Sequence, residues 1–127
     1  MSNKTKTLIV DDHAVFRSAL REFLEGMEDF EVIGEADNGK EAVELSASLS
    51  PDLVVMDVNM PELDGRKACM EIKRKKAGPI VVLYSMDTAS LRYGCDEAGA
   101  DRCLAKDELF DKLRGLRDLC GSAEIPP

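Results

Sequence analysis

Short apolar runs rich in β-branched residues alternate along this chain with stretches whose apolar residues recur at helical spacing. The expected strands span residues 7–10, 30–34, 53–56, 79–84 and 100–105. The expected helices run from Val15 to near Gly26, from the N-cap Asn38 to Ser50, and over 65–76, 89–98 and 108–120. Strand and helix alternate five times, which predicts a parallel sheet with right-handed crossovers and helices on both faces.

The chain has 127 residues, about the length of one domain. A doubly wound α/β sheet of five strands fits this length better than an eight-fold barrel does. We expect the folded domain to cover residues 1–120. Residues 121–127 are expected to form a flexible tail or the start of a linker.

The net charge of −8 argues against direct contact with nucleic acid, because the sequence offers no basic face to offset phosphate repulsion. No apolar run approaches the roughly 18 residues that a membrane-spanning helix needs. The start of the chain also lacks a secretory pattern. The expected location is therefore the cytoplasm. The four cysteines lack the spacing of metal ligands, and in that compartment we expect them to be thiols.

Polar residues follow the ends of four of the five predicted strands. Asp11 and Asp12 follow the first, Asp57 the third, Ser85 the fourth and Lys106 the fifth. In an open parallel sheet, the ligand site lies beyond the carboxyl ends of the strands. We therefore expect these five side chains to share one edge of the sheet.

Three carboxylates at one edge repel each other strongly unless a cation neutralises them. Oxygen ligands suit Mg²⁺, which keeps several waters and recruits phosphate oxygens. A lysine and a hydroxyl at the same edge would meet the other oxygens of a phosphoryl group. Each residue alone is an ordinary turn, cap or surface residue, so the combination carries the hypothesis of phosphoryl transfer.

The chain resembles the receiver domain of two-component response regulators. The resemblance covers nearly all of residues 1–120. It rests on L-I-V-D-D-H at 8–13, V-V-M-D-V-N-M-P-E-L-D-G at 54–65, Y-S at 84–85 and L-A-K at 104–106. It implies the flavodoxin-like (βα)5 fold with strand order 2-1-3-4-5.

The resemblance also implies a role for each matching residue. Asp57 would accept a phosphoryl group from a histidine kinase or a phosphotransfer protein. Ser85 and Lys106 would bind that group. Asp12, Asp57 and the backbone carbonyl of Asn59 would hold Mg²⁺. Asp11 would act in the same acidic pocket, often through water.

By the same resemblance, the chain would be a phosphoacceptor that catalyses its own phosphorylation and dephosphorylation, and not an enzyme with a separate substrate. The phosphoryl group would switch the face between the fourth strand and the last helix. Ser85 and residue 103 would take part in that switch. Family members usually carry Tyr or Phe at the latter position, where this chain has Cys103. Tyr84 and Tyr93 are candidate replacements, and the bulk of Met86 would restrict access to Asp57.

His13, Met86 and Asp107 make the local sequence resemble the subfamily that carries a C-terminal helix-turn-helix output domain. The chain would then be either a stand-alone regulator or a receiver from a longer protein, ending near Pro126-Pro127. Both a monomer and a phosphorylation-dependent dimer fit the sequence. The dimer would form through the fourth helix, fifth strand and last helix.

Three other functions compete with this hypothesis. An aspartyl phosphohydrolase would carry D-x-D after its first strand, where this chain has adjacent Asp11 and Asp12. A flavin-binding module would need a hydroxyl-rich loop there, and the loop is acidic. A degenerate receiver that serves only as a phosphorylation-independent docking module would have lost part of the acid, hydroxyl and lysine set, which is complete here.

Overall fold

The computed structural model describes residues 4–60, 62–74, 78–86 and 98–122. Its strands are β1 Thr5–Val10, β2 Phe30–Ala36, β3 Leu53–Asp57, β4 Ile80–Ser85 and β5 Arg102–Ala105. Its helices are α1 Ala14–Glu25, α2 Gly39–Leu49, α3 Gly65–Lys73 and α5 Leu109–Ser122, preceded by the 3₁₀ turn η1 Lys106–Glu108. The helix predicted over 89–98 lies almost wholly outside the described residues, and so does the predicted tail from residue 123 onward.

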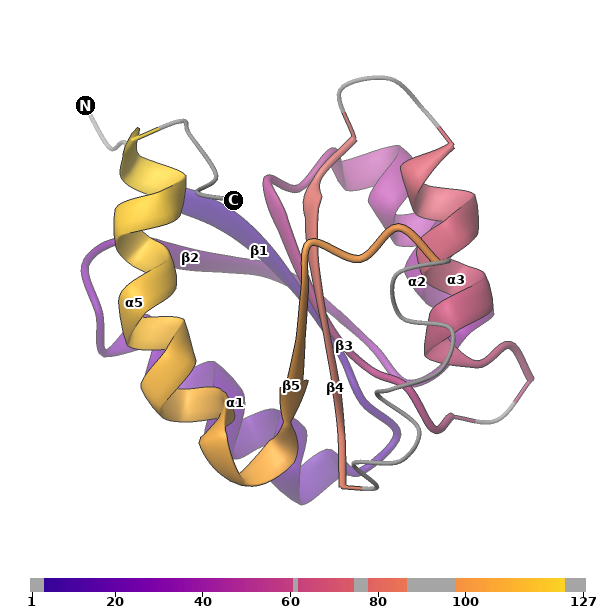
Figure 1. Ribbon diagram of the computed structural model, residues 1–127, viewed down its shortest axis with the longest axis horizontal. Coiled ribbons are helices and arrows are strands. Elements are labelled where there is room, and N and C mark those ends of the chain that lie inside the picture. Colours follow the sequence, from indigo (N-terminus) through magenta and orange to yellow (C-terminus); the bar gives the residue numbers. More distant parts are fainter. Residues whose placement is uncertain (1–3, 61, 75–77, 87–97, 123–127) are drawn as a thin grey trace.

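The strands form one parallel sheet in the order β2-β1-β3-β4-β5. This confirms the predicted doubly wound α/β fold and its strand order. Helices α1 and α5 cover one face of the sheet, and α2 and α3 cover the other (Figure 1). No helix in the described ranges has an apolar stretch long enough to cross a membrane.

Each face of the sheet has its own apolar core. The core beneath α2 and α3 includes Val10, Met56 and Leu83, and the core beneath α1 and α5 includes Ile9, Val55 and Tyr84. This alternation is the two-residue period of a strand buried on both faces. All five residues of β3 are buried, as expected for a central strand.

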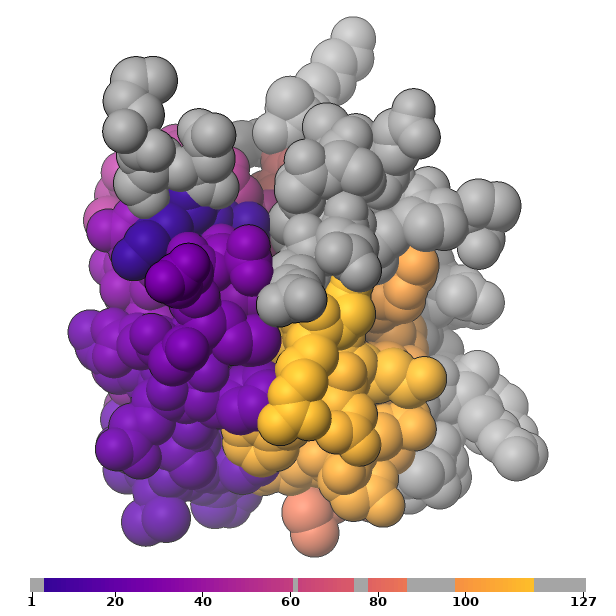
Figure 2. Space-filling model, turned by 90° about the vertical axis from the view of Figure 1, so that its left-hand side faces the viewer, coloured from indigo at the N-terminus to yellow at the C-terminus, as the bar shows by residue number. Residues whose placement is uncertain are grey.

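Helices α1 and α5 lie side by side on their face of the sheet (Figure 2). Phe110 of α5 contacts two rings of α1, with ring centroids 5.8 Å from Phe16 and 4.7 Å from Phe23. Such aromatic pairs contribute beyond the area they bury. They fix α5 against the first helix, next to the strand ends that carry the polar residues.

The element ends differ from the predicted ones by one to three residues. Strand β2 continues to Ala36 because it stays paired with β1 up to Val10. Helix α3 ends at Lys73 rather than at residue 76, and α5 runs two residues past the predicted Cys120. The predicted cap is confirmed, since the Asn38 side chain accepts a hydrogen bond of 2.8 Å from Glu41 N.

The start of α3 packs directly on the end of β3. A Cβ added at Gly65 would lie 2.3 Å from the Asp57 carbonyl oxygen, and the Gly65 N–H donates to Val58 O at 2.8 Å. Only a glycine allows this approach of two backbone segments. The loop from Asp57 to Gly65 is therefore held close to the sheet edge.

We expect Gly65→Ala to lower the free energy of unfolding by about 2 kcal/mol, because the new methyl group meets backbone that cannot rotate away. Gly115→Ala is the matched control, since a Cβ at Gly115 in α5 meets nothing within 4 Å. It should raise stability by roughly 0.5 to 1 kcal/mol through helix propensity. Urea unfolding of both variants measures the difference. Equal stabilities would contradict the close approach at Gly65.

Candidate functional site

The structure brings the five predicted polar residues to the carboxyl ends of β1, β3, β4 and β5. Asp11 follows β1, Asp57 ends β3, Ser85 ends β4 and Lys106 follows β5. Asp11, Asp57 and Ser85 are buried. The side chain of Asp12 is 31% exposed and that of Lys106 is 12% exposed. Three members of this group are therefore buried and two are partly exposed. We call Asp11, Asp12, Asp57, Ser85 and Lys106 the acidic pocket.

Strand alternation explains why three of these side chains meet. Asp11, Asp57 and Lys106 each come two residues after a member of the core beneath α1 and α5, namely Ile9, Val55 and Leu104. Residues two apart along a strand point to the same face of the sheet. The parallel register then places the ends of β1 and β3 side by side, with the end of β5 on the far side of β4 at the same edge of the sheet.

Asp11 is the most heavily bonded carboxylate of the pocket. Its Oδ1 accepts a hydrogen bond of 2.8 Å from the backbone N–H of His13. Its Oδ2 accepts one of 2.6 Å from the Tyr84 hydroxyl and lies 3.6 Å from Lys106 Nζ. Burial, followed by the nearby charge of Asp11, raises the pKa of Tyr84 above its usual value, so the phenol remains a donor.

The ring of His13 bridges the two acidic residues before it. Its Nδ1 lies 3.2 Å from Asp11 Oδ1 and 3.3 Å from Asp12 Oδ1. One ligand atom from each of Asp11, Asp12, His13 and Asp57 falls within 4.8 Å of the others. The three carboxylates fit a hard cation that prefers oxygen ligands, and the imidazole is placed to hydrogen-bond the carboxylates.

Asp57 is 4% exposed, and one of its oxygens accepts a hydrogen bond of 3.2 Å from Asn59 N. Burial and the neighbouring charge of Asp11 raise the pKa of Asp57 from 3.8 to about 6. The Asn59 hydrogen bond and Lys106 act in the opposite direction and offset only part of this. The pocket holds more negative charge than its described residues neutralise.

Ser85 and Lys106 approach the pocket from the other two strands. The Asn59 side chain donates a hydrogen bond of 2.9 Å to Ser85 Oγ. Lys106 Nζ lies 4.1 Å from the centroid of the Phe16 ring, a cation–π distance. The ammonium group is thus held between an aromatic face and the carboxylates.

Cys103 lies apart from these residues. It pairs with Leu83 across β4 and β5 and packs against the core beneath α2 and α3, whereas Tyr84 packs beneath α1 and α5. Tyr84 therefore does not replace an aromatic ring at position 103, and Tyr93 is outside the described residues. Cys103 is disulfide-bonded in the structure, which corrects the expectation of a thiol.

Sequence reasoning missed the contacts that brace the pocket from α1. Arg17 donates from Nη1 to the Asp11 carbonyl oxygen at 2.7 Å and from Nε to Glu35 at 2.9 Å. Arg21 also donates to Glu35. Burial alone would raise the pKa of Glu35, but the hydrogen bonds from Arg21 and Arg17 lower it below the usual value. The spacing of four between Arg17 and Arg21, which places both on one face of α1, was the available signal.

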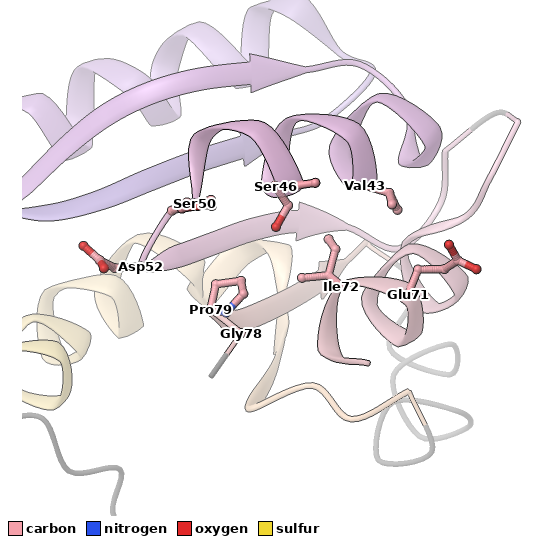
Figure 3. Close-up of a pocket in the computed structure, with 10 residues that line it drawn as sticks. Val43, Ser46, Ser50, Asp52, Glu71, Ile72, Gly78 and Pro79 are labelled. Carbon is pink, nitrogen blue, oxygen red and sulfur yellow. The ribbon is translucent and has the colours of Figure 1, made fainter. Parts of the chain in front are cut away.

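A separate pocket opens between α2 and α3 (Figure 3). Its lining includes Ser46 of α2, Ile72 of α3, Asp52 before β3 and Pro79 before β4. It therefore lies near the amino ends of these strands, and the acidic pocket lies at their carboxyl ends. The two are distinct.

The raised pKa of Asp57 predicts a pH-dependent gain in stability for Asp57→Asn in metal-free buffer. Protonated Asp57 contributes to the free energy of unfolding. This contribution is fully present below pH 3.8 and is lost as the pH rises through about 6, because the folded state disfavours the charged carboxylate. The variant should be more stable than wild type by on the order of 2 kcal/mol at pH 7.5 and equal to it near pH 4.

Urea unfolding at the two pH values, with a chelator present, measures this effect. The exposed Asp37, changed to Asn, is the control and should show no such dependence. A constant difference between Asp57→Asn and wild type at both pH values would contradict the charge repulsion.

Comparison with known proteins agrees with this geometry. The model of the family described as the response regulator receiver domain matches residues 7–116. The transcriptional regulatory protein YdfI of Bacillus subtilis is 43% identical over 108 residues, which cover 85% of this chain and 51% of that protein. A protein-glutamate methylesterase/protein-glutamine glutaminase of Methanococcoides burtonii is 51% identical over 114 residues, covering 90% of this chain and 31% of that protein.

Among solved structures, the signal receiver domain of the response regulator NarL from Mycobacterium tuberculosis is similar with a TM-score of 0.81 and 28% identity. The likeness covers 91% of this chain and 98% of that one. The chain spans about a third to a half of the length of the two curated relatives. Because the matched residues 7–116 include all of β1 to β5 apart from the first two residues of β1, the chain belongs to the receiver domain family of two-component response regulators.

Proposed function

We propose that this chain accepts a phosphoryl group on Asp57 from a histidine kinase or a phosphotransfer protein, in a Mg²⁺-dependent reaction. The observation that carries the proposal is the meeting of Asp11, Asp12 and Asp57 with Lys106 at one sheet edge. Membership of the receiver family supports it.

In the proposed reaction, a carboxylate oxygen of Asp57 attacks the phosphorus of a phosphohistidine. The new O–P bond forms an acyl phosphate while the P–N bond breaks. The electron pair of that bond leaves with the imidazole nitrogen, which takes up a proton. Lys106 would then place its ammonium charge against a phosphoryl oxygen, and the Ser85 hydroxyl would donate a hydrogen bond to another.

The donor set fits Mg²⁺, since three carboxylates within reach of one another exceed the charge of Lys106. We infer that Asp12, Asp57 and the Asn59 carbonyl would hold the ion directly and that Asp11 would hold it through water. When bound, Mg²⁺ supplies positive charge that offsets the repulsion between Asp57 and the incoming phosphoryl oxygens.

In this proposal Ser85 turns toward the phosphoryl group. Its oxygen accepts a hydrogen bond from the Asn59 side chain, and a serine hydroxyl can accept one such bond while it donates another to a phosphoryl oxygen. Turning toward the phosphoryl group would realign the hydrogen bond from Asn59 at the end of β4. We infer that this movement begins the switch of the face from β4 to α5, with Cys103 on the neighbouring strand. Met86 is 78% exposed, so its side chain does not fill the pocket.

The proposed receiver covers residues 1–120 and acts in the cytoplasm as a monomer or a phosphorylation-dependent dimer. In a longer regulator, residues from about 121 would lead to an output domain, as the partial coverage of the curated relatives suggests. A phosphorylation-independent docking module remains the second candidate. Its best support is Cys103, which stands where the family usually has an aromatic ring.

We expect incubation with Mg²⁺ and a small phosphodonor such as phosphoramidate to add one phosphoryl group to the wild type. Asp57→Asn, which lacks a nucleophilic carboxylate, should gain none. Intact-protein mass spectrometry measures both. The exposed Asp37→Asn is the control and should be modified like the wild type. An unmodified wild type would favour the docking module, and continuous release of phosphate from a small ester would favour a hydrolase.

Mg²⁺ should raise the melting temperature of the wild type, since an ion that binds the folded state stabilises it. The gain should fall sharply in Asp12→Asn and Asp57→Asn, which each lose a charged ligand. Thermal unfolding with a series of Mg²⁺ concentrations, at constant ionic strength, measures the gain. Equal gains in all three proteins would place the ion elsewhere.

A further inference from the structure

Tyr84 is fully buried, its hydroxyl contacts Asp11 of the acidic pocket, and it has no part in the mechanism above. Its ring belongs to the core beneath α1 and α5, with its centroid 5.6 Å from that of Phe16. In the sheet, Tyr84 of β4 is the backbone partner of Asp57 of β3. A buried phenol needs a hydrogen-bond partner, and here the partner is the Asp11 carboxylate.

The Tyr84 hydroxyl and Lys106 share one carboxylate oxygen. Asp11 Oδ2 lies 2.6 Å from the Tyr84 hydroxyl, which is a short hydrogen bond, and 3.6 Å from Lys106 Nζ. The second distance is too long for a hydrogen bond, so Lys106 is attracted to Asp11 without donating to it. The phenol is therefore the group that hydrogen-bonds Asp11 Oδ2, and the ammonium group lies farther from the same oxygen.

We propose that Tyr84 is a positioning residue that keeps Lys106 available for the phosphoryl group on Asp57. This inference rests on the proposed function. Without the hydroxyl, Asp11 Oδ2 would be a buried carboxylate oxygen whose nearest described donor is Lys106, and the two would pair directly. With the hydroxyl present, Lys106 can move to the phosphoryl oxygens while Asp11 keeps its short hydrogen bond.

The aromatic face of Phe16 supports the same arrangement. Lys106 Nζ lies 4.1 Å from the Phe16 centroid and 5.8 Å from that of Tyr84. A cation–π contact attracts the ammonium group without using its hydrogen-bond donors. Lys106 is therefore kept at the edge of the pocket with donors that can turn toward the phosphoryl group.

The variant Tyr84→Phe isolates the hydroxyl, because it keeps the ring that packs on Phe16. The measurement is the rate of phosphorylation of the full chain by phosphoramidate at saturating Mg²⁺, with the maximal rate and the half-saturating donor concentration determined separately. We expect Tyr84→Phe to lower the maximal rate about tenfold, the loss of one charge-assisted hydrogen bond, and to leave half-saturation unchanged.

A Lys106→Gln background distinguishes the positioning role from a merely structural role of Tyr84, because a structural role would cost the same rate with or without Lys106. If Tyr84 acts through Lys106, adding Tyr84→Phe to Lys106→Gln should cost less than about twofold, because the residues act as a unit. Thr7→Val is the matched control: Thr7 is buried in β1 and its hydroxyl donates to Thr5 O at 3.0 Å, away from the pocket. It should phosphorylate like the wild type.

An equal loss from Tyr84→Phe in both backgrounds, or no loss in either, would overturn the positioning role while leaving the proposed function standing. A wild type that takes up no phosphoryl group would overturn the proposed function itself. If Tyr84→Phe does not fold, a crystal structure of the wild type with Mg²⁺ and beryllofluoride decides. Lys106 should then contact the fluorides while Tyr84 still donates to Asp11, and a Tyr84 hydroxyl turned away from Asp11 would overturn the inference.

Discussion

Repulsion among Asp11, Asp12 and Asp57 is the constraint on which the pocket depends. Two of these carboxylates are buried, and burial strengthens the interaction between them. Burial and the charge of Asp11 together raise the pKa of Asp57. A fold that gathers these charges needs groups that hold the carboxylates in place, and it needs a cation to relieve the repulsion between them.

The sheet and the loops at its edge hold the carboxylates in place. Parallel pairing fixes the ends of β1 and β3 side by side, and cores on both faces prevent either strand from sliding. The acidic loop after β1 is braced by Arg17, which donates to the Asp11 carbonyl oxygen, and by the His13 N–H and ring. The loop after β3 is pinned where Gly65 packs on Asp57. The acidic residues are therefore held by backbone contacts, His13 and Arg17 as well as by Lys106.

Strand alternation and strand-end residues were enough to predict the sheet, its parallel direction and the meeting of five polar residues at one edge. Those features depend on local periodicity and on a general rule about parallel sheets. The element ends were less predictable, because pairing with a neighbour decides where a strand such as β2 stops.

The contacts that tune the pocket could not be read from the sequence. The sequence suggested Tyr84 as a replacement for an aromatic ring at position 103. Only the register places its hydroxyl 2.6 Å from Asp11, 73 positions away in the chain. Arg17 and Glu35 pair across α1 and β2 by the same kind of long-range placement. The disulfide at Cys103 went against an expectation based on cysteine spacing and on the expected cytoplasmic location.

We infer that the pocket concentrates negative charge and that a bound cation relieves it. The first effect should raise the pKa of Asp57 and the second should lower it. The most direct measurement is the pKa of Asp57, followed through its carboxyl carbon by NMR titration with and without Mg²⁺. We predict a pKa of about 6 in metal-free protein and a clearly lower pKa when Mg²⁺ is present. An ordinary pKa near 3.8 without the ion, unchanged when the ion is added, would contradict this explanation of the pocket.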